Sequence, residues 1–153
     1  MPRIDLEAIE QSNRTGYPAP YDRDVQGRWA RRLAAPLGLS ALGASHVVLK
    51  PGAWSSQRHW HEGVDELLVM LSGEAVLVED GGETMLRAGD IAVWPKGERN
   101  GHQLQNRSQA DCAMICVSAG DAAGDSGEYP DIDLKFAPEG YLHKDGTPYP
   151  PKG

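Results

Sequence analysis

The sequence predicts an all-β fold of short antiparallel strands, with an arm at each end of the chain. Segments with strand-like patterning follow one another closely, at about residues 44–50, 56–61, 65–71, 74–79, 83–86, 91–94, 101–106 and 111–118. Turn residues separate these segments, and the 153 residues include 18 glycines and 11 prolines. So many turns are what an all-β barrel needs.

The turns account for the strand boundaries. Ser72-Gly73, Asp80-Gly81-Gly82 and Ala88-Gly89-Asp90 all offer the positive φ that hairpins need. The segment Glu62–Asp65 contains a glycine and acidic residues, which suit a tight reversal between the strands on either side. The last segment, 111–118, is apolar on both faces, as a core strand would be.

The arms are expected to pack on one single domain whose barrel core is residues 44–118. Residues 1–43 are interpreted as an irregular N-terminal arm, extended at Tyr17–Tyr21 and with one or two helical turns from Arg28 to Ala34. Its basic cluster of Arg28, Arg31 and Arg32 around Trp29 is interpreted as a solvated helical face or a salt-bridged arm, in preference to a phosphate site. Residues 119–153 form an acidic and then proline-rich C-terminal arm, lying over the barrel or over a partner subunit.

Composition and charge exclude several classes of protein. A net charge of −7 argues against a nucleic-acid-binding surface, for which a basic stripe is expected. The N-terminus lacks a secretory signal and no apolar run approaches the ~18 residues that span a bilayer, so we expect no membrane association and a cytoplasmic location. Cys112 and Cys116 would lie about 13 Å apart on one strand, too far for a disulfide, and are interpreted as core thiols.

Four residues predict a metal site. Alternate residues of a strand share a face, so His59 and His61 point the same way. The reversal after His61 brings Glu66 back beside them, and His102 follows a second turn-rich element. Imidazole and carboxylate together suit one divalent ion of zinc, iron, manganese, nickel or copper, among which the sequence does not choose. His-x-His alone is a weak signal, because a solvated or hydrogen-bonded pair of histidines is the commoner explanation. For the four residues together, the competing interpretation is a barrel that keeps them around an empty site.

At these positions the chain resembles the cupin superfamily. The first motif of that family is matched by Gly52, His59-Trp60-His61, Glu66 and Gly73, and the second by Gly89, Pro95-Lys96-Gly97, His102 and Asn106. One extra residue separates Gly52 from His59, and two extra residues separate Gly97 from His102. The resemblance covers residues 44–118 and implies a small jelly-roll β-barrel with a metal inside. The segments Tyr129–Leu134 and His143–Tyr149 also resemble the ends of bacterial cupins sometimes grouped with sugar-phosphate isomerases.

Three further residues are candidates for roles beside the metal. Gln57 shares the inward parity of the two histidines and could orient a ligand or hydrogen-bond a metal-bound water, or equally be a plain structural partner. Tyr141 and His143 could close the mouth of the barrel and act as acid or base, although surface positions on a loop are the better-supported interpretation. Trp60 is expected on the outer face, against the arm or a second subunit, and a homodimer is predicted.

The ligand set leaves one or two open coordination positions, so two hypotheses follow. The first is a metal-dependent enzyme acting on a small oxygen-bearing organic molecule, as an isomerase, oxygenase or lyase. The second is a non-catalytic module that binds or senses a small molecule in the same pocket. A sensor usually carries a DNA-binding or signalling domain, and the arm before the barrel is too short and irregular for one, which favours the enzyme. A storage or purely structural protein fits poorly with an intact ligand set.

Overall fold

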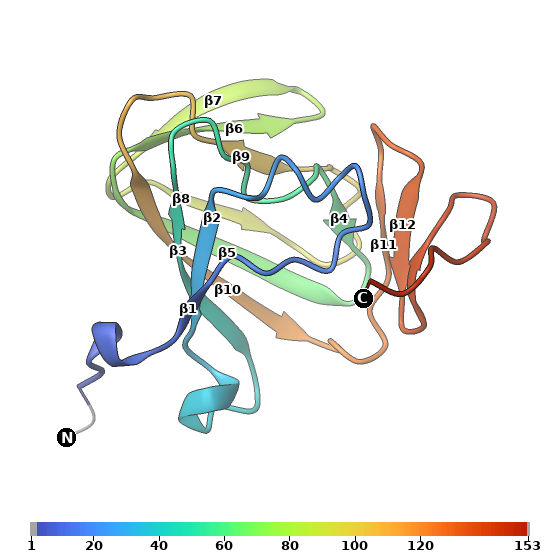
Figure 1. Cartoon of the computed structure of the whole chain (residues 1–153), viewed down its shortest axis with the longest axis horizontal. Coiled ribbons are helices and arrows are strands. Elements are labelled where there is room, and N and C mark those ends of the chain that lie inside the picture. The colour runs from blue at the N-terminus through green and yellow to red at the C-terminus, as the bar shows by residue number, and fades with distance from the viewer. Residues whose placement is uncertain (1–2, 153) are drawn as a thin grey trace.

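The computed structural model describes residues 3–152 and consists almost entirely of short strands (Figure 1). The strands are β1 (Gln11–Ser12), β2 (Arg28–Arg32), β3 (Gly43–Leu49), β4 (Trp60–His61), β5 (Val64–Ser72), β6 (Glu74–Glu79), β7 (Gly82–Arg87), β8 (Ile91–Trp94), β9 (Gln103–Gln105), β10 (Cys112–Gly120), β11 (Gly127–Tyr129), β12 (Leu134–Ala137) and β13 (Gly140–Leu142). Two short 3-10 helices, η1 (Leu6–Ala8) and η2 (Ala35–Leu37), accompany them. Within residues 3–152, neither helix has the length or the apolar character to cross a membrane.

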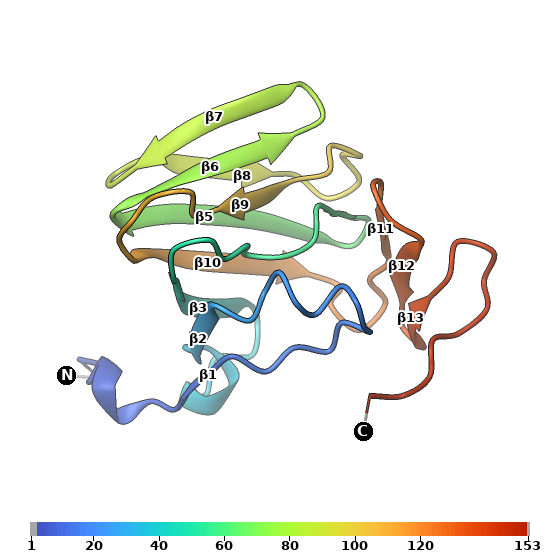
Figure 2. The same cartoon turned by 45° about the horizontal axis from the view of Figure 1, so that its top comes forward.

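The strands form three antiparallel sheets. The largest has the order β1-β2-β3-β10-β5-β8, the second β13-β12-β11-β4, and the third β7-β6-β9. Figure 2 shows the third sheet above the first, with β11, β12 and β13 standing at one end of both. The predicted all-β jelly-roll architecture is therefore confirmed, as two facing sheets that hydrogen bonds do not join into a closed ring.

The main core lies between the six-stranded and the three-stranded sheets. Its buried side chains come from β3, β5 and β10 on one side and from β6, β7 and β9 on the other: Val47, Leu49, Leu68, Met70, Ala75, Leu77, Leu86, Leu104, Cys112 and Met114. Alternate residues of each strand face opposite sides, so Cys112 and Met114 are buried while Ala113 and Ile115 are less so. Both cysteines are free thiols, and burial raises the pKa of Cys112 to about 11 and of Cys116 to about 12.

The structure corrects the prediction for residues 28–34, which form no helical turn. Residues 28–32 are strand β2, paired with β3 from Arg28 opposite Leu49 to Arg32 opposite Ser45. Strand β1 adds to its other side through Gln11 and Ser12. The backbone groups of β3 need hydrogen-bond partners, and this long-range pairing outweighs the weak local preference for a helix. Residues expected in an irregular arm thus extend the main sheet.

A second cluster joins the two ends of the chain. Tyr17 and Val25 from the N-terminal segment pack with Tyr129 and Leu134 from the C-terminal segment, and the rings of Tyr17 and Tyr129 lie 5.6 Å apart. The C-terminal segment also pairs directly with β4, where Gly127 lies opposite His61. A Cβ atom at Gly127 would lie 2.0 Å from the carbonyl oxygen of Trp60, so only glycine permits this close approach.

Candidate metal centre

Two short segments bring three histidines together. The residue before β4, His59, forms a bridge with His102: the His59 amide donates to the His102 carbonyl (3.2 Å), and the His102 amide donates back (2.9 Å). His61 is the second residue of β4. The predicted strand at 56–61 is therefore shorter than expected, but its backbone pairing sets the two histidine-bearing segments side by side.

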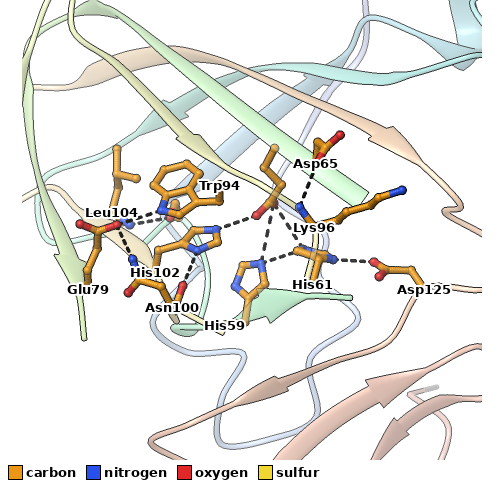
Figure 3. A network of polar contacts seen from close by, with 12 residues as sticks. His59, His61, Asp65, Glu79, Trp94, Lys96, Asn100, His102, Leu104 and Asp125 are labelled. Carbon is orange, nitrogen blue, oxygen red and sulfur yellow. Dashed lines mark hydrogen bonds and ion pairs between the residues drawn. The ribbon is translucent and has the colours of Figure 1, made fainter. Parts of the chain in front are cut away.

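The imidazoles of His59, His61 and His102 lie near one another (Figure 3), and the carboxylate of Glu66 is within 4.0 Å of all three. Strand β5 presents it on the inner face, with the buried Leu68 and Met70 further along. Glu66 Oε2 is 2.6 Å from His102 Nε2, and Oε1 is 3.3 Å from His61 Nε2 and 4.0 Å from His59 Nε2. Ligand atoms of His59, His61 and Glu66 all lie within 4.8 Å of one another, so these three residues form a possible metal site.

Each imidazole is oriented through its Nδ1 atom. The Nδ1–H of His59 donates to the Gln57 carbonyl (2.8 Å) and that of His102 to the Asn100 carbonyl (3.1 Å). The Nδ1–H of His61 donates to Asp125 Oδ2 at 2.5 Å. Carbonyl and carboxylate oxygens only accept hydrogen bonds, so these partners place a proton on Nδ1 in all three rings, and Nε2 carries a lone pair whenever the ring is neutral.

This tautomer pattern fits a cation. The Nε2 atoms of His59 and His61 are 3.1 Å apart, and both face the Glu66 carboxylate. Converging lone pairs and a carboxylate repel one another unless a positive charge lies among them. Three imidazole nitrogens and one carboxylate oxygen are a donor set that zinc and other divalent first-row metals accept.

The electrostatics of the cluster agree with this arrangement. Burial lowers the pKa of His59 to about 4, so this ring is neutral at pH 7. Burial opposes ionisation of Glu66, but its contacts with His102 and His61 outweigh that effect and lower its pKa well below the usual range. For His61 the effect of burial is likewise outweighed, by Glu66 and Asp125, and its pKa is raised. A proton on His61 Nε2 would occupy the position that a metal ion takes over on binding.

Comparisons with known proteins agree with the fold and the motifs. The family model of the cupin domain matches residues 45–118. A crystal structure from Silicibacter pomeroyi, described as a sugar phosphate isomerase from a cupin superfamily, is 37% identical, covers 97% of each chain and superposes with a TM-score of 0.90. The chain belongs to the cupin superfamily.

Two other proteins match this cupin over a smaller part of the chain. An oxalate-binding protein from Thermotoga maritima is 33% identical over 73 residues, which are 48% of this chain and 58% of that protein, so the match spans little more than half of its length. The structure of a polyketide cyclase from Streptomyces resistomycificus is 18% identical, covers 78% of this chain and 79% of that one, and has a TM-score of 0.63, a likeness of fold alone.

Sequence reasoning missed Asp125, which orients His61 in this cupin. One of its carboxylate oxygens accepts from His61, and the other accepts from the Gly63 amide at 2.8 Å. A Cβ atom at Gly63 would lie 3.1 Å from Asp125 Oδ1, so glycine lets the reversal before β5 approach the carboxylate. Asp125 follows His61 by 64 positions in a generally acidic segment, and no spacing signal distinguishes it from its neighbours.

A second missed group supports His102. The indole of Trp94 stacks on its imidazole, with ring centroids 3.9 Å apart and planes 6° from parallel. The indole N–H donates to Glu79 Oε1 (2.9 Å), and the same oxygen accepts from the Asn100 side chain (3.0 Å). Asn100 in turn supplies the carbonyl that orients His102. Glu79 therefore holds both groups that fix this ring.

The side chain of Gln57 points toward the N-terminal segment. Its Nε2 donates to the Tyr21 carbonyl and to Asp24 Oδ2, both at 3.0 Å, and its backbone amide donates to the Tyr17 hydroxyl. The main-chain carbonyl of Gln57, however, is the group that orients His59. Its contact with the candidate metal centre is therefore through the backbone.

Tyr141 and His143 lie outside the group of imidazoles. The ring of Tyr141 packs against Tyr17 at 5.5 Å and lies 6.4 Å from Tyr129, and Tyr129 is the phenol beside His59, at 5.5 Å. His143 donates from Nδ1 to Asp133 Oδ2 at 2.7 Å and stacks on Tyr149 with ring centroids 3.8 Å apart. The structure thus places Tyr141 in the aromatic cluster and His143 in a separate surface network.

A cavity of about 550 Å³ opens on the candidate centre. His59, Glu66 and His102 contribute to its wall, together with apolar residues such as Leu68 and Leu104. Its size is in the range of pockets that hold small organic molecules.

Proposed function

We propose that this cupin binds one divalent metal ion through His59, His61, Glu66 and His102 and is an enzyme acting on a small oxygen-bearing molecule. The observation that carries the proposal is the grouping of His59, His61 and Glu66, whose ligand atoms lie within 4.8 Å of one another, beside a cavity of about 550 Å³. His102 Nε2 lies 2.6 Å from the same carboxylate. Oxygen acceptors engage the Nδ1 atoms of all three rings, which leaves the Nε2 atoms as the ones that face the carboxylate and are available to a metal ion.

In this proposal, the chain's own residues bind the metal ion and orient its ligands. When bound, a divalent ion supplies Lewis-acid chemistry, by polarising a substrate oxygen or lowering the pKa of a coordinated water. Gln57, Asn100 and Asp125 hold the imidazoles in the orientation that coordination requires. Leu68 and Leu104 give the cavity wall an apolar part beside the histidines. Neither Tyr141 nor His143 carries a step in the proposal.

Isomerisation of a sugar phosphate is the leading reaction. The protein from Silicibacter pomeroyi that matches over nearly the whole chain is described as a sugar phosphate isomerase. An aldose–ketose isomerisation takes a proton from C2 and returns one at C1, so it needs a polarised carbonyl but no oxidant or co-substrate. A single metal centre at the wall of a small cavity suits that requirement.

Non-catalytic ligand binding is the second candidate. It is favoured by the similarity of 73 residues to an oxalate-binding protein, because that protein's description names binding and no reaction. A dicarboxylate has oxygen pairs that could occupy the open positions of the same centre. The two candidates therefore share a metal site and differ in whether the ligand is changed.

Metal analysis followed by a solvent-exchange assay tests both candidates. Protein purified without added metal is expected to contain one equivalent of a divalent first-row metal, measured by elemental analysis. With aldose and ketose phosphates in D₂O, proton NMR is expected to show deuterium incorporation that chelation stops and added metal restores. Metal and ligand binding without any turnover would select the binding module instead. No metal as purified, and no uptake of zinc, manganese, iron, nickel or copper, would contradict the proposal.

A homodimer is also proposed, on the basis of an exposed apolar face. Ile91 and Val93 are 63% and 60% exposed on β8, which ends the six-stranded sheet, and Leu71 on neighbouring β5 is 46% exposed. Trp60, expected against the arm or a second subunit, is buried within the chain, opposite Glu128 of the C-terminal segment and with the Arg99 guanidinium 5.0 Å from its ring centroid. An apolar face can complement a second copy of itself about a two-fold axis.

Sedimentation velocity tests the dimer. The unmodified protein is expected to sediment as a dimer, and the double variant Ile91→Lys, Val93→Lys as a monomer, because a buried unpaired charge opposes association. Met85→Lys, at a partly exposed position on β7 of the three-stranded sheet, is the matched control and should remain dimeric. A monomeric unmodified protein would show that this face has no such role.

A further inference from the structure

Strand β2 divides its arginines between two faces. In the register with β3, Arg28 lies opposite Leu49 and Arg32 opposite Ser45, so these two residues and Ala30 share the face directed at the cavity. All three line the cavity that contains His59, Glu66 and His102. Arg31 has the opposite parity, and its guanidinium binds Glu7 (2.9 Å) and the Ile9 carbonyl (3.1 Å). The interpretation of the basic cluster as a salt-bridged arm therefore describes Arg31 alone.

The cavity carries an excess of positive charge. Glu66 is the one carboxylate among the described residues that line it, and this carboxylate belongs to the candidate metal centre. The other titratable groups there include Tyr17 and Cys116, which are neutral because burial raises the pKa of each to about 12. None of the ion pairs formed among residues 3–152 involves Arg28 or Arg32. Two guanidinium groups thus border the cavity without a carboxylate to balance them.

The protein holds Arg28 in place and leaves much of its binding capacity free. Its Nη1 donates to the Ser55 carbonyl at 2.9 Å, and Nη2 makes a longer contact to the Arg14 carbonyl at 3.5 Å. A guanidinium has five N–H donors, so three remain for another partner. Arg32 is exposed and no hydrogen bond of its side chain is formed within residues 3–152, so all of its donors are available. Serines 45, 55 and 118 and Gly43 line the same cavity as both arginines.

We propose that Arg28 and Arg32 bind the anionic group, a phosphate or a carboxylate, of a ligand whose oxygen donors reach His59, Glu66 and His102. This inference rests on the proposed metal site for one end of the ligand and assigns the other end to β2. A planar guanidinium matches both phosphate and carboxylate with paired hydrogen bonds. Both arginines line the same cavity as His59, Glu66 and His102.

Three probes that share one carbon skeleton test the proposal. Glycerol 3-phosphate, glycerate and glycerol are titrated by calorimetry into the protein as purified with its metal. At least one of the two anions is expected to bind about tenfold or more tightly than glycerol, since hydrogen bonds between charged groups are the stronger ones. Tighter binding of glycerol 3-phosphate would identify a phosphate site, and tighter binding of glycerate a carboxylate site. Glycerol binding as tightly as both anions would overturn the proposal.

Variants of one strand separate this inference from the metal proposal. Arg28→Gln and Arg32→Gln are each expected to weaken binding of the preferred anion by about tenfold or more, while Arg31→Gln, on the opposite face, leaves it unchanged. The Arg32 side chain forms no hydrogen bond or ion pair with the rest of residues 3–152, so its variant remains informative even if Arg28→Gln destabilises the fold. Equal metal content in all proteins, with anion binding unchanged in Arg28→Gln and Arg32→Gln, would refute the arginine site alone. Failure of the proposed function would appear instead as missing metal in the unmodified protein.

Discussion

Replacing His61 or His59 with alanine is expected to abolish stoichiometric metal binding while the protein still folds. Each change removes one of four donors and leaves a gap that water would have to fill, so we expect affinity to fall by roughly 100-fold or more, beyond the effect of losing an outer partner. The fold should persist because the main core lies between the two facing sheets and does not include these histidines. Elemental analysis of the purified variants measures the metal, and circular dichroism measures the fold.

His143→Ala is the matched control for these variants. His143 is also a histidine bonded to an aspartate, at 2.7 Å from Asp133, but it lies in the separate surface network beside Tyr149. Its variant should keep one equivalent of metal. Unchanged metal content in both His59→Ala and His61→Ala would show that the ligand assignment is wrong.

Changing Asp125 to asparagine is expected to weaken metal binding by roughly 10-fold to 100-fold. Asp125 now accepts from both His61 and the Gly63 amide, and an asparagine has only one oxygen for these two donors. If that oxygen faces Gly63, the amide nitrogen faces His61 Nδ1 and favours the tautomer protonated at Nε2. The proton then occupies the lone pair that the metal needs. Competition titration with a chromophoric chelator measures the change in affinity.

Asp121→Asn controls for the loss of a negative charge in the same loop. Asp121 is exposed, and one of its oxygens accepts from the Gly124 amide at 3.0 Å without contacting a histidine. Metal affinity should be the same as in the unmodified protein. If Asp125→Asn and Asp121→Asn weakened binding equally, general electrostatics rather than orientation of His61 would be the cause.

The strands between residues 44 and 118 were predictable because their signals are local. Segments 74–79 and 91–94 have the bounds that β6 and β8 show in the structure, since Gly73, Gly81 and Gly89 mark the turns beside them. Pairing between strands that are distant in the sequence leaves no such local signal. Strand β2 depends on an exposed row of backbone groups on β3, which no pattern within residues 28–34 reveals, so its residues were assigned to a helical turn.

The residues around the candidate centre likewise fall into two groups, those close together in the sequence and those far apart in it. His59, His61 and Glu66 lie within eight positions of one another, and strand parity with one turn was enough to predict that they meet. Asp125, Glu79 and Trp94 come from other parts of the chain. Asp125 and Trp94 contact the histidines, and Glu79 holds Trp94, only after the sheets have assembled. Their positions follow from long-range packing, which leaves no fixed spacing in the sequence.

The amino-acid sequence alone predicted the strand pattern of the barrel, the donor residues of the candidate centre and the family, because each depends on neighbouring residues and short spacings. The folded chain decided which imidazole nitrogen meets the oxygen that orients the ring and which arginines of β2 face the cavity. Both depend on the partner that each backbone or side chain finds across the sheets, through pairings such as Arg32 with Ser45 and His61 with Gly127. Such pairings are set by the hydrogen-bonding needs and packing of the whole molecule.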